Sequence, residues 1–161
     1  MDPTPSIDAL LAACRQGSPL AWEALVRRFQ DRVYATCYLY LRNAHDAEEL
    51  AQEAFIHVYR NLDKYHGNGD EFVGWLLRVT RNACIDRLRY KKARLPQYRG
   101  SENEEPALPA DHTMAPDRML AVAQEQALIH HALAQVDTET RDLIVLKEIQ
   151  GLSLLEVAGI L

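Results

Sequence analysis

Residues 72–94 constrain the fold more than any other stretch, because they allow one long helix with two chemically different faces. The segment reads FVGWLLRVTRNACIDRLRYKKAR and contains no proline, and no glycine after Gly74. Such a composition permits a helix of about five or six turns. On a helical wheel one side is apolar, formed by Phe72, Leu76, Val79, Ala83 and Tyr90. We therefore expect an amphipathic helix that buries this side in a core.

The same segment reverses the charge of the chain. It carries seven basic side chains and a single acid, whereas the whole protein of 161 residues has a formal net charge of −5. Trp75 lies inside the segment and Tyr65 lies just upstream in a glycine-rich turn. Basic side chains beside aromatic rings are typical of proteins that bind single-stranded nucleic acid, because cations hold phosphates and rings stack on unpaired bases. A solvated basic face without a ligand is the simpler alternative, and Arg87 and Lys91, near the apolar side, could instead pair with acids of neighbouring helices.

Composition excludes several other classes of protein. Hydrophobic residues make up 48% of the chain, which is enough for a packed core, and no apolar run is long enough to cross a membrane. The N-terminus lacks the basic flank of a secretion signal, so we expect a cytoplasmic protein without membrane insertion. Cys14, Cys37 and Cys84 are widely spaced, and His130 and His131 are adjacent rather than one turn apart. We expect reduced thiols, and neither a metal nor another cofactor.

The N-terminal half predicts three further helices. Ser6 or Asp8, and Ser18 followed by a proline, are start signals for two of them, of which the second runs to about residue 42. Asp46 with Glu49 fits a capping box that opens a helix over residues 46–62, and a glycine-rich loop follows over residues 63–74. The expected buried face of this helix consists of Ala47, Leu50, Ala51, Ala54, Val58 and Leu62, and the opposite face of Glu49, Gln52, Glu53, Ile56 and Arg60. Because Ile56 stands among charges, this opposite face suggests a surface for another protein.

Residues 95–119 differ from the rest because they combine four prolines with five acids. We expect an acidic flexible linker here, and a domain boundary. Beyond it, residues 120–134 predict a helix, Asp137 caps the next, Gly151 ends it, and Ser153 with Glu156 forms a capping box for a final helix. This order is the first half of a helix-turn-helix. The expected fold is all-α, with an N-terminal helical bundle over residues 1–94, the linker, and an incomplete helix-turn-helix domain over residues 120–161.

Three segments resemble the extracytoplasmic-function (ECF) group of bacterial sigma factors, the minimal members of the sigma-70 family. They are AWEALVRRFQDRVYATCYLYLRNAHDAEELAQEAFIHVYRNL, FVGWLLRVTRNACIDRLR and LIVLKEIQGLSLLEVAGIL. The block DAEELAQEAF, followed at a fixed distance by WLLRVTRNACIDRLR, is a highly specific combination. The resemblance implies a region 2 domain, a connector and the beginning of a region 4 domain. It also implies a non-enzymatic function, in which the protein binds core RNA polymerase and directs promoter recognition, melting of the −10 element and initiation of transcription.

The resemblance further implies roles for individual residues. The contact with core polymerase, on the clamp helices of its largest subunit, is matched by Asp46, Glu49, Leu50, Gln52, Glu53 and Phe55, and Ile56 shares that surface. The segment that opens and holds the single-stranded non-template −10 DNA is matched by Tyr65, His66, Asn68, Trp75, Arg78, Arg81 and Asn82. Its basic continuation is matched by Arg87, Arg89, Lys91 and Lys92. An anti-sigma factor is a further expected partner.

The chain departs from the family pattern at its C-terminal end. The basic helix that would read the −35 element does not follow LLEVAGIL, so we expect a truncated or naturally short chain without direct −35 reading. Leu155, Val157 and Ile160 would lose their usual cover, and we expect this segment to be mobile, docked on the first domain, or in contact with another copy.

Two alternatives to an ordinary sigma factor remain at this stage. The first is a shortened regulatory module that binds polymerase or an anti-sigma factor without initiating transcription. The second is a nuclease with Asp46, Glu49 and Glu53 as metal ligands. We disfavour the nuclease because these acids cap and decorate a helix, and no histidine or lysine accompanies them at a useful spacing.

Overall fold

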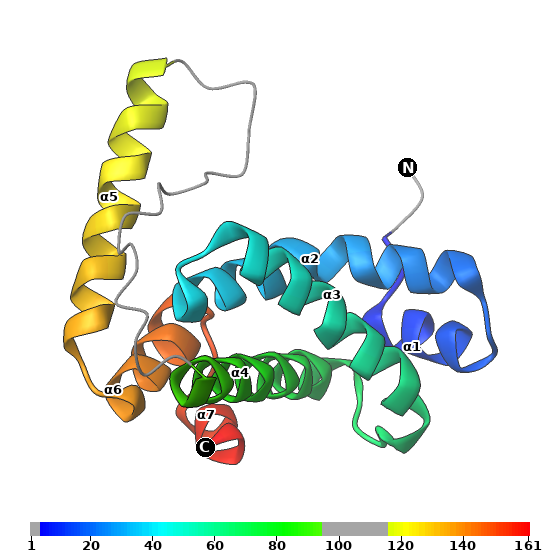
Figure 1. Ribbon diagram of the computed structural model, residues 1–161. Helices are drawn as coiled ribbons and strands as arrows, with labels where there is room; N and C mark the ends of the chain where they lie inside the picture. The colour runs from blue at the N-terminus through cyan, green and yellow to red at the C-terminus, as the bar shows by residue number, and fades with distance from the viewer. Residues whose placement is uncertain (1–3, 95–115) are drawn as a thin grey trace.

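The computed structural model describes residues 4–94 and 116–161, and within these ranges it contains helices and no strand (Figure 1). The predicted all-α fold is confirmed. The elements are α1 (Ile7–Arg15), α2 (Pro19–Leu41), α3 (Ala44–Asn61), the short 3₁₀ helix η1 (Leu62–Lys64), α4 (Gly69–Arg94), α5 (Pro116–Gln135), α6 (Thr138–Leu143), the π-helical turn η2 (Ile144–Ile149) and α7 (Leu154–Ile160). The predicted linker over residues 95–119 lies outside the described residues, except for residues 116–119, which belong to α5.

The first two helices begin where their capping residues predicted. The hydroxyl of Ser6 accepts the N–H of Ala9 at 3.1 Å, and that of Ser18 accepts the N–H of Ala21 at 3.3 Å. Between the two helices Gly17 has a φ of +81°, a left-handed conformation that glycine adopts without strain. These three residues set the sharp turn from α1 into α2.

Three predicted helix starts were wrong by a few residues, and one of them is that of the helix expected from residue 120, which begins at Pro116 as α5. The side chain of Asn43 accepts the N–H of Asp46 at 2.8 Å, so α3 begins at Ala44 and the expected capping box at Asp46 does not form. Helix α4 begins at Gly69 rather than at residue 72. The N–H of Gly69 donates to Asp8 of α1 at 2.7 Å, and the side chain of Asn68 accepts the N–H of Glu71 at 3.0 Å. Helix α4 therefore begins earlier than predicted, because Asp8 of α1 and Asn68 of the glycine-rich run accept hydrogen bonds from its first turn.

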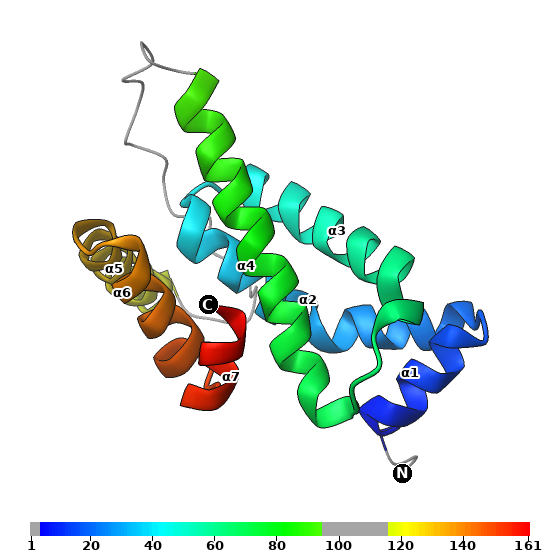
Figure 2. The same cartoon turned by 90° about the horizontal axis from the view of Figure 1, so that it is seen from below.

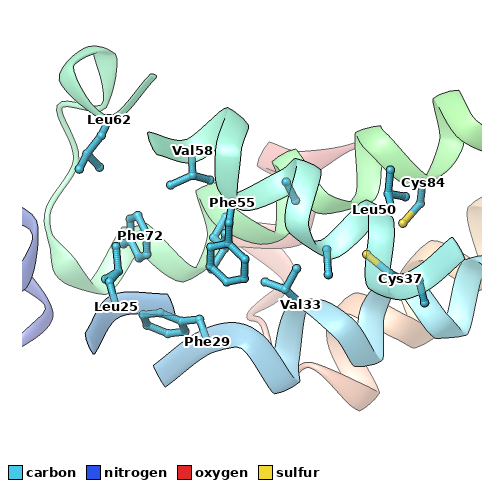
Figure 3. Close-up of a cluster of buried hydrophobic side chains, with 14 of the residues drawn as sticks. Leu25, Phe29, Val33, Cys37, Leu50, Phe55, Val58, Leu62, Phe72 and Cys84 are labelled. Carbon is cyan, nitrogen blue, oxygen red and sulfur yellow. The ribbon is translucent and has the colours of Figure 1, made fainter. Parts of the chain in front are cut away.

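Helices α1 to α4 enclose the main core (Figure 3). The predicted apolar face of α3 is buried throughout, and the rings of Phe29 and Phe72 meet in the core with centroids 5.6 Å apart. Burying a side chain of this size stabilises the fold by roughly 1.5–3 kcal/mol. Tyr90 was wrongly placed on the buried side of α4, since it is 54% exposed, with the guanidinium of Arg94 4.8 Å from the centroid of its ring. The C-terminal end of α4 extends beyond the neighbouring helices of the bundle (Figure 2).

Helix α7 lies against α4 (Figure 2). The predicted capping box of Ser153 and Glu156 opens α7. A second apolar cluster joins this part of the chain to α4 and consists of Leu77, Leu146, Leu152, Val157 and Ile160. Leu155 remains 85% exposed. Of the three arrangements expected for this segment, the structure shows it docked on the N-terminal helices.

Cys37 and Cys84 are buried and Cys14 is half-buried, all as free thiols. Within residues 4–94 and 116–161, no three histidine, cysteine, aspartate or glutamate side chains gather in a way that would hold a metal ion. No helix in these ranges has the length and apolar character needed to cross a membrane.

Candidate functional site

The outward face of α3 is acidic with an apolar centre. Glu49, Gln52 and Glu53 are exposed, and Ile56 is 50% exposed among them. Leu50 and Phe55, which the sequence assigned to the same contact, are instead buried in the core. Both residues help to hold α3 in place, and Phe55 also lines the groove next to Ile56.

An apolar groove adjoins this face. It runs between the α1–α2 turn and α3, has a volume of about 390 Å³, and is lined in part by Trp22, Phe55, Ile56 and Tyr59. The ring centroid of Trp22 lies 5.1 Å from that of Tyr59, edge to face. The sequence did not predict this groove, because Trp22 and Tyr59 lie on different helices and each alone reads as an ordinary core or surface aromatic.

The acids of α3 are paired with bases of α4. Arg87 donates through Nη1 to Oε2 of Glu49 at 3.2 Å and through Nη2 to Oε1 of Glu53 at 3.0 Å, and Lys91 forms an ion pair with Asp46. Burial alone would lower the pKa of Arg87, but its bonds to the two glutamates raise that pKa on balance. The sequence left open whether Arg87 and Lys91 bind a ligand or pair with acids of neighbouring helices. The structure shows both residues paired with acids of α3.

The loop before α4 is built around Tyr65. Its ring is buried and stacks on that of Trp75 with centroids 4.7 Å apart, and its hydroxyl donates to the carbonyl of Asn68 at 2.6 Å. Arg15 of α1 donates to the carbonyl of Tyr65, also at 2.6 Å. Burial, followed by the charge of Glu71, raises the pKa of Tyr65 to about 12, so its hydroxyl stays protonated at neutral pH. Tyr65 thus orders the loop, while His66 and Asn68 are exposed on it.

The basic face of α4 is only partly open to a ligand. Arg78, Asn82, Arg89 and Lys92 are exposed, and Trp75 is half-buried. Arg89 approaches Asp86 at 3.9 Å with both side chains in solvent, a contact that adds little stability. Arg81 differs, because it donates through Nη2 to Oδ2 of Asp142 at 2.6 Å and through Nε to Oδ1 at 3.3 Å.

Asp142 is a residue that sequence reasoning missed. It lies on α6, is 1% exposed, and also accepts the hydroxyl of Tyr40 of α2. The hydrogen bond to Asp142 raises the pKa of Arg81, so the guanidinium remains charged. No local pattern marked Asp142, because its partners lie 61 and 102 residues away in the chain.

Comparison with known proteins decides the family. Residues 25–94 match the Sigma-70 region 2 family. The chain is 34% identical to the ECF RNA polymerase sigma factor SigW of Bacillus subtilis over 155 residues, which cover 91% of this chain and 80% of that protein. This chain belongs to the ECF sigma factors. It is also 27% identical over 156 residues to the ECF RNA polymerase sigma-E factor of Escherichia coli, covering 94% of this chain and 81% of that protein.

Two solved structures resemble this sigma factor. CnrH in complex with the cytosolic domain of CnrY aligns with a TM-score of 0.68 and 24% identity over 96% of this chain and 82% of CnrH, which supports the fold. An engineered region 2 of sigmaE in complex with GTAAAA aligns with a TM-score of 0.53 and 28% identity over 60% of this chain and 99% of that chain.

Membership of this family settles the general activity. The protein is a non-enzymatic transcription initiation factor that partners RNA polymerase and directs it to promoter DNA. Nothing in these similarities favours the alternative of a shortened regulatory module that does not initiate.

Proposed function

We propose that the two exposed faces divide the work of this sigma factor. The outward face of α3 docks on core polymerase, and the loop of residues 65–70 with the exposed side of α4 holds the non-template strand of the melted −10 element. The observation that carries this proposal is the chemical contrast between neighbouring helices. Exposed acids surround Ile56 on α3, whereas the exposed side chains of α4 from Arg78 onward include Arg78, Asn82, Arg89 and Lys92, with Asp86 as the one exposed acid in that part of the helix.

The polymerase-docking side is supported by the groove beside Ile56. An exposed apolar groove flanked by acids suits a partner helix that carries apolar and basic side chains. Leu50 holds the helix in place from the core, so its part in docking is indirect, whereas Phe55 contributes to the wall of the groove. An anti-sigma factor that competes with polymerase for the same face is a further proposed partner.

The DNA-binding side is supported by the open cations of α4 and by the loop above Tyr65. Extruding a base from a duplex costs a few kcal/mol. Stacking on an aromatic ring returns about 1–3 kcal/mol per base, and contacts between cations and phosphates add salt-dependent affinity. His66 and Asn68 are placed to meet a base, while Tyr65 and Trp75 stiffen the loop beneath them. Neither stacking nor phosphate contacts alone offset the cost of extruding a base. We therefore expect the free protein to bind DNA weakly and the polymerase-bound protein to bind it strongly.

The similarity to an engineered region 2 solved in complex with GTAAAA lends this side support, since that short sequence was bound without a whole sigma factor. The proposal is tested by changing one face at a time and measuring polymerase binding beside open-complex formation. Variants of α4 must lower open-complex formation alone, and variants of α3 must lower polymerase binding.

A further inference from the structure

A small basic cavity lies where the end of α2 meets α5 and α6. It has a volume of about 180 Å³ and is lined in part by Arg42, His130 and Arg141. A single water needs about 15 Å³ of cavity volume, so this cavity has room for an ion of several atoms. Two guanidinium groups and an imidazole thus line it, and no described residue of its lining is an acid.

Both arginines offer hydrogen-bond donors to this cavity. Arg141 donates through Nε to the carbonyl of Leu133 at 3.0 Å and through Nη2 to that of Val136 at 3.4 Å, which fixes its guanidinium without using every N–H group. Arg42 follows the last residue of α2 with a φ of 56°, and its exposed side chain forms no ion pair with any described residue. Guanidinium groups bind oxyanions through paired N–H bonds, so the two arginines suit an anion that enters between them.

His130 adds a buried nitrogen that lacks a hydrogen bond. The residue is 7% exposed, and its Nδ1 has no partner among the described residues. Buried polar atoms without a partner are rare in native proteins, and a bound ion or water is a common explanation for them. Burial, and then the charge of Arg42, lower the pKa of His130, so the imidazole is neutral at pH 7 and donates through one ring nitrogen.

Asp142 is the acid that stands next to this site in the chain. It accepts the hydroxyl of Tyr40, which itself lines the cavity. The carboxylate of Asp142 is already paired with Arg81, through hydrogen bonds at 2.6 and 3.3 Å. Its charge is therefore offset from the other side, and the charges of Arg42 and Arg141 remain available to a ligand.

We propose that this cavity binds a small tetrahedral oxyanion of the phosphate class between the guanidinium groups of Arg42 and Arg141, with the imidazole of His130 as a further donor. The ion joins the end of α2 to α5 and α6, and so stabilises the contact between these helices. Free inorganic phosphate and the terminal phosphate of a nucleotide offer the same chemistry. None of the three residues belongs to the faces assigned to polymerase or to DNA, so this inference does not rest on the proposed function.

The first test removes one cation from the cavity. Isothermal titration calorimetry of the whole chain with sodium phosphate measures the affinity, and sodium chloride at equal ionic strength is the blank. Arg42→Gln removes a charge at the site, and Arg60→Gln removes the same charge from the exposed side of α3. We expect saturable one-to-one binding that Arg42→Gln weakens by about tenfold or more and Arg60→Gln leaves unchanged. Absence of saturable binding, or equal weakening by both variants, would overturn the proposal.

A second pair of variants fills the cavity from within. Ala134 of α5 lines it, so Ala134→Glu places a carboxylate against the two arginines, whereas Ala134→Gln adds a side chain of the same size without charge. A ligand that binds the folded state raises the melting temperature in proportion to its occupancy. Phosphate should therefore raise the melting temperature of Ala134→Gln and leave that of Ala134→Glu unchanged. Shifts of equal size in the two variants would contradict the site.

Further titrations identify the source of the anion. Tighter binding of ADP than of phosphate would support the site with a nucleotide as its ligand, whose base and sugar lie outside the cavity. Equal or weaker binding of ADP would support it with free phosphate as the ligand. The oligonucleotide GTAAAA is the competitor that separates this site from DNA contacts. If it displaces bound phosphate, the cavity belongs to the DNA-binding surface and the proposal of a small-anion site is wrong.

Discussion

Nη2 of Arg87 on α4 lies 3.0 Å from Oε1 of Glu53 on α3, and the same guanidinium reaches Glu49 one turn earlier. One cation thus orients two carboxylates of the proposed polymerase-docking face. Family resemblance assigned Arg87 to DNA binding. In the structure its guanidinium forms ion pairs with two acids of α3. Together with Lys91 and Asp46, this pairing also lowers the number of free cations that the protein offers to DNA in the absence of polymerase.

The first prediction concerns Arg87→Ala. The ion pairs are partly exposed, so each contributes about 0.2–1 kcal/mol and the free energy of unfolding should fall only slightly. Affinity for core polymerase should fall severalfold, because Glu49 and Glu53 lose the group that orients them. A competition assay for core polymerase measures this, with Arg89→Ala as the matched control. Loss of DNA binding with unaltered polymerase affinity would return Arg87 to the DNA side.

A second prediction separates the two apolar residues assigned to polymerase contact. Ile56→Asp should abolish polymerase binding and leave the melting temperature nearly unchanged, because Ile56 is half exposed. Leu50→Asp should unfold the bundle, because Leu50 is 2% exposed and a charge there has no partner. Circular dichroism melts beside polymerase pull-down measure both effects. A stable Leu50→Asp protein would contradict the packing of α3.

Tyr65 provides a third prediction. Tyr65→Phe removes the hydrogen bond to the carbonyl of Asn68 and should cost about 1 kcal/mol of stability. Tyr65→Ala also removes the stack on Trp75 and should cost about 3–5 kcal/mol. Urea denaturation measures both changes. If Tyr65 served only to stack on a base, both variants would keep wild-type stability, and only Tyr65→Ala, which lacks a ring, would lose promoter opening.

His130 predicts how stability changes with pH. Its ring is buried edge-on to Tyr38, its Nδ1 has no hydrogen-bond partner among the described residues, and Arg42 and Arg141 line the same small cavity. Burial, and then the charge of Arg42, lower the pKa of His130 below its usual 6.5. The unfolded chain therefore binds more protons, and this contribution to stability is present above about pH 6.5 and is lost as pH falls toward the lowered pKa.

The measurement for His130 compares urea unfolding at pH 7.5 and pH 5.5 in the wild type and in His130→Phe. The variant keeps an aromatic ring against Tyr38 but cannot be protonated. Its stability should fall less on acidification than that of the wild type. Equal losses in both proteins would show that protonation of His130 is not the cause.

The contrast between local and distant interactions explains what the sequence could predict. Ser6, Ser18 and Ser153 cap helices through bonds to residues three positions away, and all three starts were predicted. Asp142 binds Arg81 and Tyr40 from far along the chain, and no periodicity reveals such a pair.

Tyr65 shows the same limit at the site itself. An aromatic residue beside glycines suggested a free stacking ring, but the ring of Tyr65 is buried against Phe72 and Trp75 of α4. The residues of each face could mostly be predicted from the helical wheel, with Tyr90 as an exception. Their pairing across helices could not, because it depends on how α3, α4 and α6 pack.

The division of labour between the two faces is the central claim, and one paired measurement tests it most directly. Arg78→Ala with Asn82→Ala changes exposed residues of α4, and Ile56→Asp changes the docking face. Each holoenzyme is assayed for assembly by native gel and for promoter opening by permanganate reactivity of the −10 element. The account predicts normal assembly with lost opening for the α4 variant, and lost assembly for Ile56→Asp. Equal loss of assembly and opening in the α4 variant would contradict it.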